Sequence, residues 1–353
     1  MRESVIEHLI CPHTGSRLRA LVRERVGDRI TEGELVSDLD AQRRYPIRGG
    51  VPRIISTADL EKGQQETIAS FSYKWAQIPG YGHDPATKAN RERWYFERFG
   101  FTQGDSDLAA LLRDAQFVLE AGIGTGVDTD LLIRNFSGNL FGVDISDAID
   151  TAYGRFHEYE RLSLLQADIA RLPFRPEFFD VISCDQVLHH TPDPPTYFTR
   201  LTTLLKPGGR LLLYVYRVKG PIREFTDDHL RSLVARNSLE ACVELCEKLT
   251  RLGRNLSHLR ATVEIEDDIP ELGITRGRYD VQRLLYDHVL KCFWNDDYDF
   301  ATNAMVNFDW YRPIHAFRYT EADVRKWASN AGMAIEHFQV APSGISTIMK
   351  KRG

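Results

Sequence analysis

The sequence predicts an α/β fold whose core is a Rossmann-like, mainly parallel sheet. Three observations support this prediction. Apolar segments of strand length alternate with segments long enough for crossover helices between residues 117 and 216, as in βαβ units. The first apolar segment ends in Glu120 and a turn with glycines at positions 122, 124 and 126. Acidic residues also end the second and third segments, so carboxylates would meet at one edge of the sheet.

The predicted strands cover residues 117–122, 140–144, 163–168, 180–185 and 210–216. Parallel strands need long crossover connections, which the intervening segments supply. After Tyr216 the alternation stops for roughly ninety residues, and helices are predicted there over 226–252 and 280–293. The alternation resumes with a helix over 320–331, with Thr320 as its N-cap, and with strands over 334–340 and 346–350.

This order divides the chain into five segments. They are a small β-rich unit (1–57), a helical segment that would cover a ligand (58–115), the ligand-binding core (116–217), a helical insertion (218–316) and the last helix with the closing strands (317–353). The insertion should lie on the ligand side of the sheet and act as a lid that determines specificity.

Composition limits the classes of partner. The chain has 353 residues and a formal net charge of −5, so no bulk attraction to nucleic acid is expected. No apolar run approaches the length of a membrane span. The five cysteines are most simply reduced thiols in the cytoplasm.

The glycine turn is the most informative local pattern. Glycines at alternate positions let a ligand approach the backbone closely, and Glu120 could accept hydrogen bonds from an ammonium group. A dinucleotide fingerprint starting at Gly124 would need glycine or alanine at position 129, where Thr129 stands. The pattern therefore favours S-adenosylmethionine over NAD. The alternative is a tight turn without a ligand.

The acids on the next two strands suit the rest of a nucleoside. Asp144 could take both ribose hydroxyls, with Ile145 against adenine. Asp168 could accept a hydrogen bond from the adenine amino group. The alternatives are a helix N-cap for Asp144, a turn residue for Asp168 and a core position for Ile145.

Five segments in order carry a resemblance to a known family, over about residues 116–217. They read EAGIGTG, GVDIS, ADIARLPF, FDVISCDQVLHHTPDP and LKPGGRLLLYVY. The chain resembles class I S-adenosylmethionine-dependent methyltransferases of the group that includes ubiquinone and menaquinone C-methyltransferases. The resemblance implies a seven-stranded sheet with an antiparallel last strand and S-adenosyl-L-methionine as cofactor. It implies cofactor contacts for Glu120, Gly122, Gly124, Gly126, Asp144, Ile145, Asp168, Ile169, Asp185 and Gln186.

Two further resemblances lie upstream. The segment Phe71-Ser72-Tyr73-Lys74-Trp75 resembles an F-G-x-Q-W signature of bacterial relatives, which implies that Tyr73 and Trp75 cover the cofactor. Aromatic packing of a helix on the sheet is the alternative.

The N-terminal unit resembles a small zinc-ribbon-like methyltransferase activator domain through Leu9-Ile10-Cys11-Pro12 and the segment from Tyr45 to Pro52. Only Cys11 of the expected cysteine ligands is present. Thr14 stands where its partner should be, and structural zinc needs about four ligands. We therefore expect no metal, and a relic that serves packing, dimerisation (a homodimer) or substrate docking.

Candidates for a catalytic base come from two places. His189 and His190 follow the fourth predicted strand and could remove an acceptor proton, although shaping the pocket is the commoner role in the family. A second cluster near the end of the insertion contains Asp309, Tyr311 and His315, and could form a polar wall of the acceptor site. A structural loop is the alternative.

These patterns predict a cytoplasmic methyltransferase of small-molecule biosynthesis. Three alternatives remain at this stage: an enzyme that uses the same cofactor for non-methyl chemistry, a cofactor-binding scaffold that activates a partner, and an RNA or protein methyltransferase. The acidic net charge counts against RNA.

Overall fold

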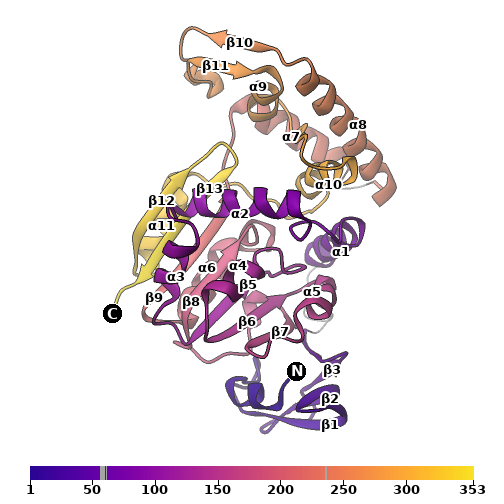
Figure 1. Cartoon of the computed structure of the whole chain (residues 1–353), viewed down its shortest axis with the longest axis vertical. Coiled ribbons are helices and arrows are strands. Elements are labelled where there is room, and N and C mark those ends of the chain that lie inside the picture. The colour runs from indigo at the N-terminus through magenta and orange to yellow at the C-terminus, as the bar shows by residue number, and fades with distance from the viewer. Residues whose placement is uncertain (56–59, 61, 235–236) are drawn as a thin grey trace.

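A single large sheet organises the molecule (Figure 1). The computed structural model describes residues 1–55, 60, 62–234 and 237–353. Within these residues the sheet has eleven strands in the order β1-β2-β3-β4-β7-β6-β5-β8-β9-β13-β12. Its central part consists of β5 (Phe117–Ala121), β6 (Asn139–Asp144), β7 (Leu162–Ala167), β8 (Phe179–Asp185), β9 (Leu205–Tyr216), β12 (Met333–Val340) and β13 (Gly344–Lys351).

The central strands confirm the predicted Rossmann-like, mainly parallel sheet with an antiparallel last strand. Strands β5 to β9 pair in parallel, and β13 pairs antiparallel with β9. Strand β9 begins at Leu205 rather than at residue 210, because the Lys206–Gly209 turn stays beside β8 across an irregularity in register.

Strand residues alternate between the two faces of the sheet, as the period of two requires. On one face, Leu119, Ile182 and Leu213 pack with α6 (Pro194–Leu204) and α11 (Glu321–Asn330). On the other face, Val118, Val181 and Leu212 pack with α2 (Pro85–Phe99), α3 (Asp105–Leu112) and α4 (Thr129–Asn135). Helix α5 (Ala148–Phe156) covers β6 and β7. Burial on both faces explains why these strands are continuously apolar.

Side-chain caps fix the starts of several helices. The predicted N-cap Thr320 forms a capping box with Asp323 at the start of α11. Asp84 and Asp193 cap α2 and α6, each followed by proline in the first turn. Such caps satisfy backbone N–H groups that have no partner inside the helix.

The N-terminal strands extend the central sheet. Strands β1 (Leu18–Val26), β2 (Arg29–Ser37), β3 (Arg44–Arg48) and β4 (Val51–Ile54) form an antiparallel series after the short helix η1 (Glu3–His8). Strand β4 then pairs in parallel with β7. Apolar side chains of this unit, such as Leu35 and Ile47, belong to the same buried cluster as Leu119 and Leu213. The expected boundary at residues 57 and 58 lies outside the described residues.

The helical segment after the N-terminal unit begins with α1 (Lys62–Gln77), followed by α2 and α3. In Figure 1, α1 and α2 lie between the central sheet and the insertion. The described part of the chain contains no helix long and apolar enough to cross a membrane.

The insertion differs from its prediction in four places, the first being that the helix predicted over 280–293 ends at His288. It contains α7 (Pro221–Val234), α8 (Leu239–His258), β10 (Thr262–Ile265), β11 (Gly277–Asp280), α9 (Val281–His288) and α10 (Phe300–Tyr311). The helix predicted over 226–252 is two helices, because Ser238 caps a new one. The β10–β11 hairpin was not predicted, since its strands are short and largely exposed. Helix α10 was not predicted either, and it is buried on most of its surface.

Candidate cofactor and acceptor site

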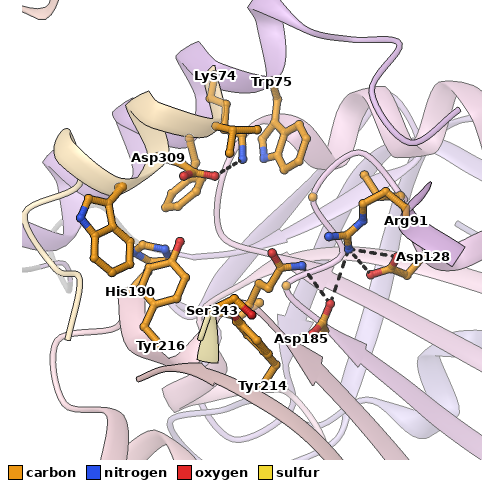
Figure 2. A pocket seen from close by; sticks show the side chains of 18 of the residues that line it. Lys74, Trp75, Arg91, Asp128, Asp185, His190, Tyr214, Tyr216, Asp309 and Ser343 are labelled. Atoms are coloured by element: carbon orange, nitrogen blue, oxygen red, sulfur yellow. Dashed lines mark hydrogen bonds and ion pairs between the residues drawn. The ribbon is translucent and has the colours of Figure 1, made fainter. Parts of the chain in front are cut away.

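A cavity of about 630 Å³ lies at the carboxyl ends of the parallel strands. Strands β5 to β9 and the segments that follow them supply one wall, α1 and α2 another, and the insertion a third. The turn between β12 and β13 adds Pro342 and Ser343. Figure 2 shows aromatic and charged side chains from these elements pointing into it. This is the sheet edge at which open α/β folds bind ligands.

The glycine turn after β5 brings backbone to the cavity. Gly122 and Gly124 have φ angles of 83° and 56°, which side chains rarely adopt. A Cβ at Gly122 would overlap the Val187 side chain, and one at Gly124 would lie 3.3 Å from the Trp75 ring. Gly126 lies outside the lining, since a Cβ there would meet the Phe156 ring. Its lack of a side chain serves helix packing.

Glu120 lies at the tip of β5 and is 7% exposed. Its carboxylate accepts a hydrogen bond of 2.8 Å from the Thr129 hydroxyl. Burial, reinforced by the charges of Asp128 and Asp185, raises the pKa of Glu120 well above its usual range despite that bond. A cationic ligand group would compensate this buried acid. Thr129, which breaks the dinucleotide fingerprint, therefore orients the carboxylate.

Asp144 lies at the tip of β6 and braces the turn. It accepts hydrogen bonds from the Gly124 N–H at 2.8 Å and from the Ser146 N–H and hydroxyl at 2.7 and 2.6 Å. Burial raises the pKa of Asp144 even though these bonds oppose the shift. Ile145 lines the cavity beside it.

Asp168 completes the row at the end of β7. It accepts hydrogen bonds from the Ala170 N–H at 3.0 Å, the Gln64 side chain at 2.9 Å and the Tyr197 hydroxyl at 3.1 Å. Gln64 comes from α1, so this helix reaches over the strand tips. Ile169 also lines the cavity. The structure thus brings the three predicted strand-end acids to one cavity.

Asp185 at the end of β8 belongs to a buried ion cluster. It pairs with Arg98. It also lies 3.5 Å from Arg91, which binds Asp128 at 2.9 Å (Figure 2). The Oδ1 atom of Asp185 is buried without a hydrogen-bond partner among the described residues, so it can accept from a ligand. Gln186 has a φ of 61°, a strained conformation typical of functional sites. Arg91 and Arg98 were not predicted from the sequence, although their spacing of seven places them on one helix face.

The two histidines have different surroundings. His189 is fully buried and stacks on Tyr216, outside the cavity lining. His190 lines the cavity, and its Nδ1 donates to the His315 carbonyl at 2.7 Å. Burial lowers the pKa of His190 to about 3, although that hydrogen bond opposes the shift. His190 is therefore a neutral ring that presents Nε2 and is a weak base at neutral pH.

The three predicted residues of the cluster near the end of the insertion also differ in whether they line the cavity. Asp309 lines the cavity and pairs with Lys74 at 2.7 Å and Lys291 at 3.4 Å. Burial alone would raise the pKa of Asp309, but the two lysines lower it. Tyr311 lies outside the lining, with its hydroxyl 2.9 Å from Asp227. His315 is also outside, where its backbone N–H donates to Thr67 and its ring stacks on Phe317.

Only one of the two aromatic residues predicted on helix α1 lines the cavity. Trp75 faces the glycine turn, and the Lys74 ammonium lies 4.5 Å from its ring centroid. Tyr73 packs on Phe308 at 5.5 Å, outside the lining, which agrees with the alternative of core packing.

Other lining residues were not singled out from the sequence. Tyr214 and Tyr216 on β9 have the spacing of two that places both on one face. The others depend on segments distant in sequence, and they include Lys74, Trp94, Lys219, Arg223, Arg283, Tyr286, Lys291 and Trp310.

The N-terminal unit contains hydroxyl groups near Cys11 and Thr14. The Cys11 sulfur lies 3.2 Å from the Tyr45 hydroxyl, and Ser16 bonds to Ser37 and Thr14 at 2.8 and 2.9 Å. Among the described residues, no three His, Cys, Asp or Glu side chains are grouped to hold a metal ion. The resemblance to a zinc ribbon stays a prediction.

Comparison with known proteins identifies the central region. Residues 119–213 match the family described as methyltransferase domain. An uncharacterized protein of Synechococcus sp. is 35% identical over 136 residues, which are 35% of this chain and 30% of that protein. The ubiquinone biosynthesis O-methyltransferase of Coxiella burnetii is 29% identical over 114 residues, 29% of this chain and 48% of that one. The chain thus spans less than half the length of these relatives.

Solved structures give weaker similarities. The Burkholderia thailandensis 1,6-didemethyltoxoflavin N1-methyltransferase is 16% identical with a TM-score of 0.41, covering 89% of this chain and 98% of that one. The Synechocystis magnesium protoporphyrin IX methyltransferase is 15% identical with a TM-score of 0.42, covering 84% and 100%.

The domain match covers the glycine turn and all three strand-end acids, the residues that fit an adenosyl ligand with an ammonium group. It supports the expected enzyme class, an S-adenosyl-L-methionine-dependent methyltransferase. Residues 119–213 are therefore a methyltransferase domain, which confirms the class I methyltransferase fold and S-adenosyl-L-methionine as the cofactor.

Proposed function

We propose that the whole chain is an S-adenosyl-L-methionine-dependent methyltransferase that acts on a small molecule. One observation carries this proposal. Glu120, Asp144 and Asp168 end three adjacent parallel strands and line the same cavity as the glycine turn. A chance arrangement of turn residues would not place three acids and a backbone cradle around one cavity.

Each acid would hold a different part of the cofactor. Glu120 would bind the ammonium group of the methionine part, beside Gly122 and Gly124. Asp144 would bind the ribose hydroxyls. Asp168 and Ile169 would contact the adenine edge, while Asp185 would accept a hydrogen bond through its unpartnered oxygen near the sulfonium.

When bound, the cofactor supplies an activated methyl group. The chain's own task is to orient the acceptor and exclude water. Trp75, Tyr216 and Trp310 supply flat apolar walls for this purpose. The low pKa of His190 and the pairing of Asp309 with two lysines make both weak bases. We propose that both residues position the acceptor.

The cavity volume favours a small acceptor. About 630 Å³ is within the range of small-molecule sites, and part of it must hold the cofactor. The insertion closes the side away from the sheet, and we propose that it selects the acceptor. The N-terminal unit, in this proposal, is a metal-free relic whose role is to extend the sheet.

Cofactor binding tests the site. Asp144→Ala should weaken S-adenosylhomocysteine binding by about ten- to a hundredfold, since hydrogen bonds to charged groups contribute ~1.5–3 kcal/mol. Isothermal titration calorimetry measures this change. Asp114→Ala is the matched control, because Asp114 is exposed and lies outside the cavity. Equal affinity of wild type and Asp144→Ala would contradict the ribose role.

Product analysis separates the proposal from its alternatives. A methyltransferase forms S-adenosylhomocysteine together with a product that is 14 Da heavier than its acceptor, a mass difference of about one CH₂ group. A scaffold would bind the cofactor without turnover. Non-methyl chemistry would give a different mass change.

A further inference from the structure

Basic side chains outnumber acidic ones on the insertion side of the cavity. This side consists of the lining residues Lys219, Arg223, Arg283, Tyr286, Asp287, Lys291, Phe293, Asp309 and Trp310. Its basic members come from the segment after β9, from α7, from α9 and from the loop that follows α9. A local excess of positive charge is unexpected in a chain whose net charge is −5.

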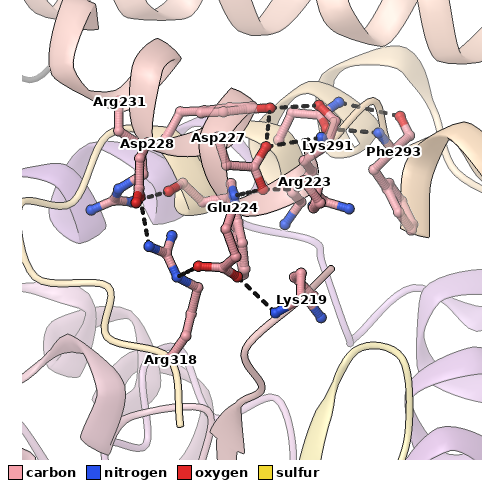
Figure 3. A network of polar contacts seen from close by, with 12 residues as sticks. Lys219, Arg223, Glu224, Asp227, Asp228, Arg231, Lys291, Phe293 and Arg318 are labelled. Carbon is pink, nitrogen blue, oxygen red and sulfur yellow. Dashed lines mark hydrogen bonds and ion pairs between the residues drawn. The ribbon is translucent and has the colours of Figure 1, made fainter. Parts of the chain in front are cut away.

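Two of the basic side chains already have acidic partners. Arg223 pairs with Asp227, which also accepts hydrogen bonds from Trp310 at 2.8 Å and from the Lys291 backbone at 3.2 Å (Figure 3). The Lys291 ammonium shares Asp309 with Lys74. These ion pairs hold the side chains on the insertion side of the cavity in place.

Lys219 and Arg283 are different. Within the described residues their side-chain cations form no ion pair, because the nearby carboxylates of Glu224 and Asp280 instead accept from the backbone N–H groups of Lys219 and Arg283, at 2.7 and 3.0 Å. Asp287 acts electrostatically on both cations. The Lys219 ammonium donates to the Ser343 carbonyl at 3.1 Å and to the Pro342 carbonyl. An ammonium has three N–H groups, so one donor is left for a ligand.

The electrostatics of Lys219 favour an anion beside it. Burial, together with the charge of Arg223, lowers the pKa of Lys219 to about 7. A bound carboxylate or phosphate would raise that pKa again and stabilise the charged lysine. Arg283 is exposed and lies at the rim of the cavity.

Aromatic rings surround these cations. The guanidinium groups of Arg223 and Arg283 lie 5.2 and 5.4 Å from the centroid of Tyr286. Lys219 and Lys291 lie 5.7 and 5.1 Å from the centroid of Trp310. The wall therefore offers flat apolar surface next to positive charge, a combination that suits a planar organic anion.

We propose that the methyl acceptor is a small planar organic acid whose anionic group binds between Lys219 and Arg283. Its flat body would lie against Tyr286, Phe293 and Trp310, and its reacting atom would point towards the strand tips. This inference rests on the proposed function and specifies its substrate class. The shared chemistry is an anionic oxygen group, either carboxylate or phosphate.

Matched probes test the inference. Protein saturated with S-adenosylhomocysteine is titrated with 4-hydroxybenzoate, phenyl phosphate and the neutral 4-hydroxybenzamide. We expect at least one anion to bind tenfold more tightly than the amide, and the tighter anion identifies the acceptor group. Lys219→Met and Arg283→Met should each reduce anion affinity fivefold or more and leave amide affinity unchanged. Arg276→Met is the control, because Arg276 is exposed on the same insertion and outside the cavity.

Three results would overturn the inference: equal affinity for acid and amide, no binding of either anion, or unchanged anion affinity in both variants. S-adenosylhomocysteine affinity is measured on the same samples. If it binds and the probes fail, the anionic acceptor is wrong and the proposed function stands. If it does not bind, the proposed function itself fails.

Discussion

At the scale of single residues, the buried carboxyl group of Glu120 couples ligand binding to protons. Its raised pKa means that the empty site holds a proton at pH values where a free glutamate, with a pKa of about 4.3, is ionised. An ammonium ligand favours the ionised form, so binding should release that proton. Affinity for S-adenosylhomocysteine should therefore rise with pH up to the raised pKa and level off above it.

Calorimetry in two buffers of different ionisation enthalpy, at a pH between the free and the raised pKa of Glu120, measures the released proton. Glu120→Gln should remove the Glu120 contribution while leaving that of Asp144, whose pKa is also raised. The raised pKa of Glu120 also affects the stability of the fold. Its contribution to stability is fully present below the pKa of the unfolded chain, and it is lost as the pH rises through the pKa of the folded protein. Glu120→Gln should therefore reduce the loss of stability on the alkaline side. Buffer-independent enthalpies in the wild type would contradict this account.

Single residues also differ in whether their place in the site could be predicted from the sequence. Glu120, Asp144 and Asp168 were predictable because each ends an apolar strand, and parallel strands end at one edge. Lys74, Arg91 and Lys219 were not, because they reach the cavity from separate helices and a connecting segment. Their roles depend on contacts with residues far away in sequence, such as the pair between Lys74 and Asp309.

At the scale of elements, periodicity predicted the sheet but not the insertion. Strands β5 to β8 and helix α11 have strong apolar patterns or caps. Helix α10 has buried amides instead: Asn303 and Asn307 accept hydrogen bonds from the Asn295 and Phe293 N–H groups at 2.7 and 2.8 Å. Buried polar groups need such partners, and these lie in the loop after α9, part of which the sequence wrongly predicted as helix over 280–293.

Asp227 connects helix α7 to helix α10 within the insertion. It is 1% exposed and accepts hydrogen bonds from Trp310 and Tyr311 of α10, besides pairing with Arg223 (Figure 3). Asp227→Asn would leave Arg223 buried without its charge partner, at a cost of about 3–5 kcal/mol. We expect faster hydrogen exchange in α7 and α10, with affinity for S-adenosylhomocysteine changed less than threefold.

Asp228→Asn provides the comparison for this variant. Its side chain is 58% exposed and pairs with Arg318, so its contribution should be within about 1 kcal/mol. Unaltered exchange in Asp227→Asn, or equal effects of the two substitutions, would show that the network does not hold the insertion in place.

At the scale of the whole molecule, the N-terminal unit and the methyltransferase domain should unfold together. Strand β4 pairs with β7, and Arg53 binds Gln166 at 3.2 Å. The short helix η1 adds His8, whose ring lies 5.2 Å from that of Phe117. A shared sheet and a shared buried cluster favour one cooperative transition.

Ile47→Ala tests whether the two parts unfold together, at a position outside the cavity lining. Ile47 is fully buried on β3, and such a truncation costs about 2–5 kcal/mol. Because unfolding is expected to be cooperative, the midpoint should fall equally whether it is followed by circular dichroism or by release of S-adenosylhomocysteine. Val26→Ala on β1 of the same N-terminal unit, where the side chain is 71% exposed, should leave both midpoints in place. The contrary result would be an early transition in Ile47→Ala while ligand release stayed at the wild-type temperature. The N-terminal strands would then be an independent domain, and their pairing with β7 would contribute nothing to the stability of the site.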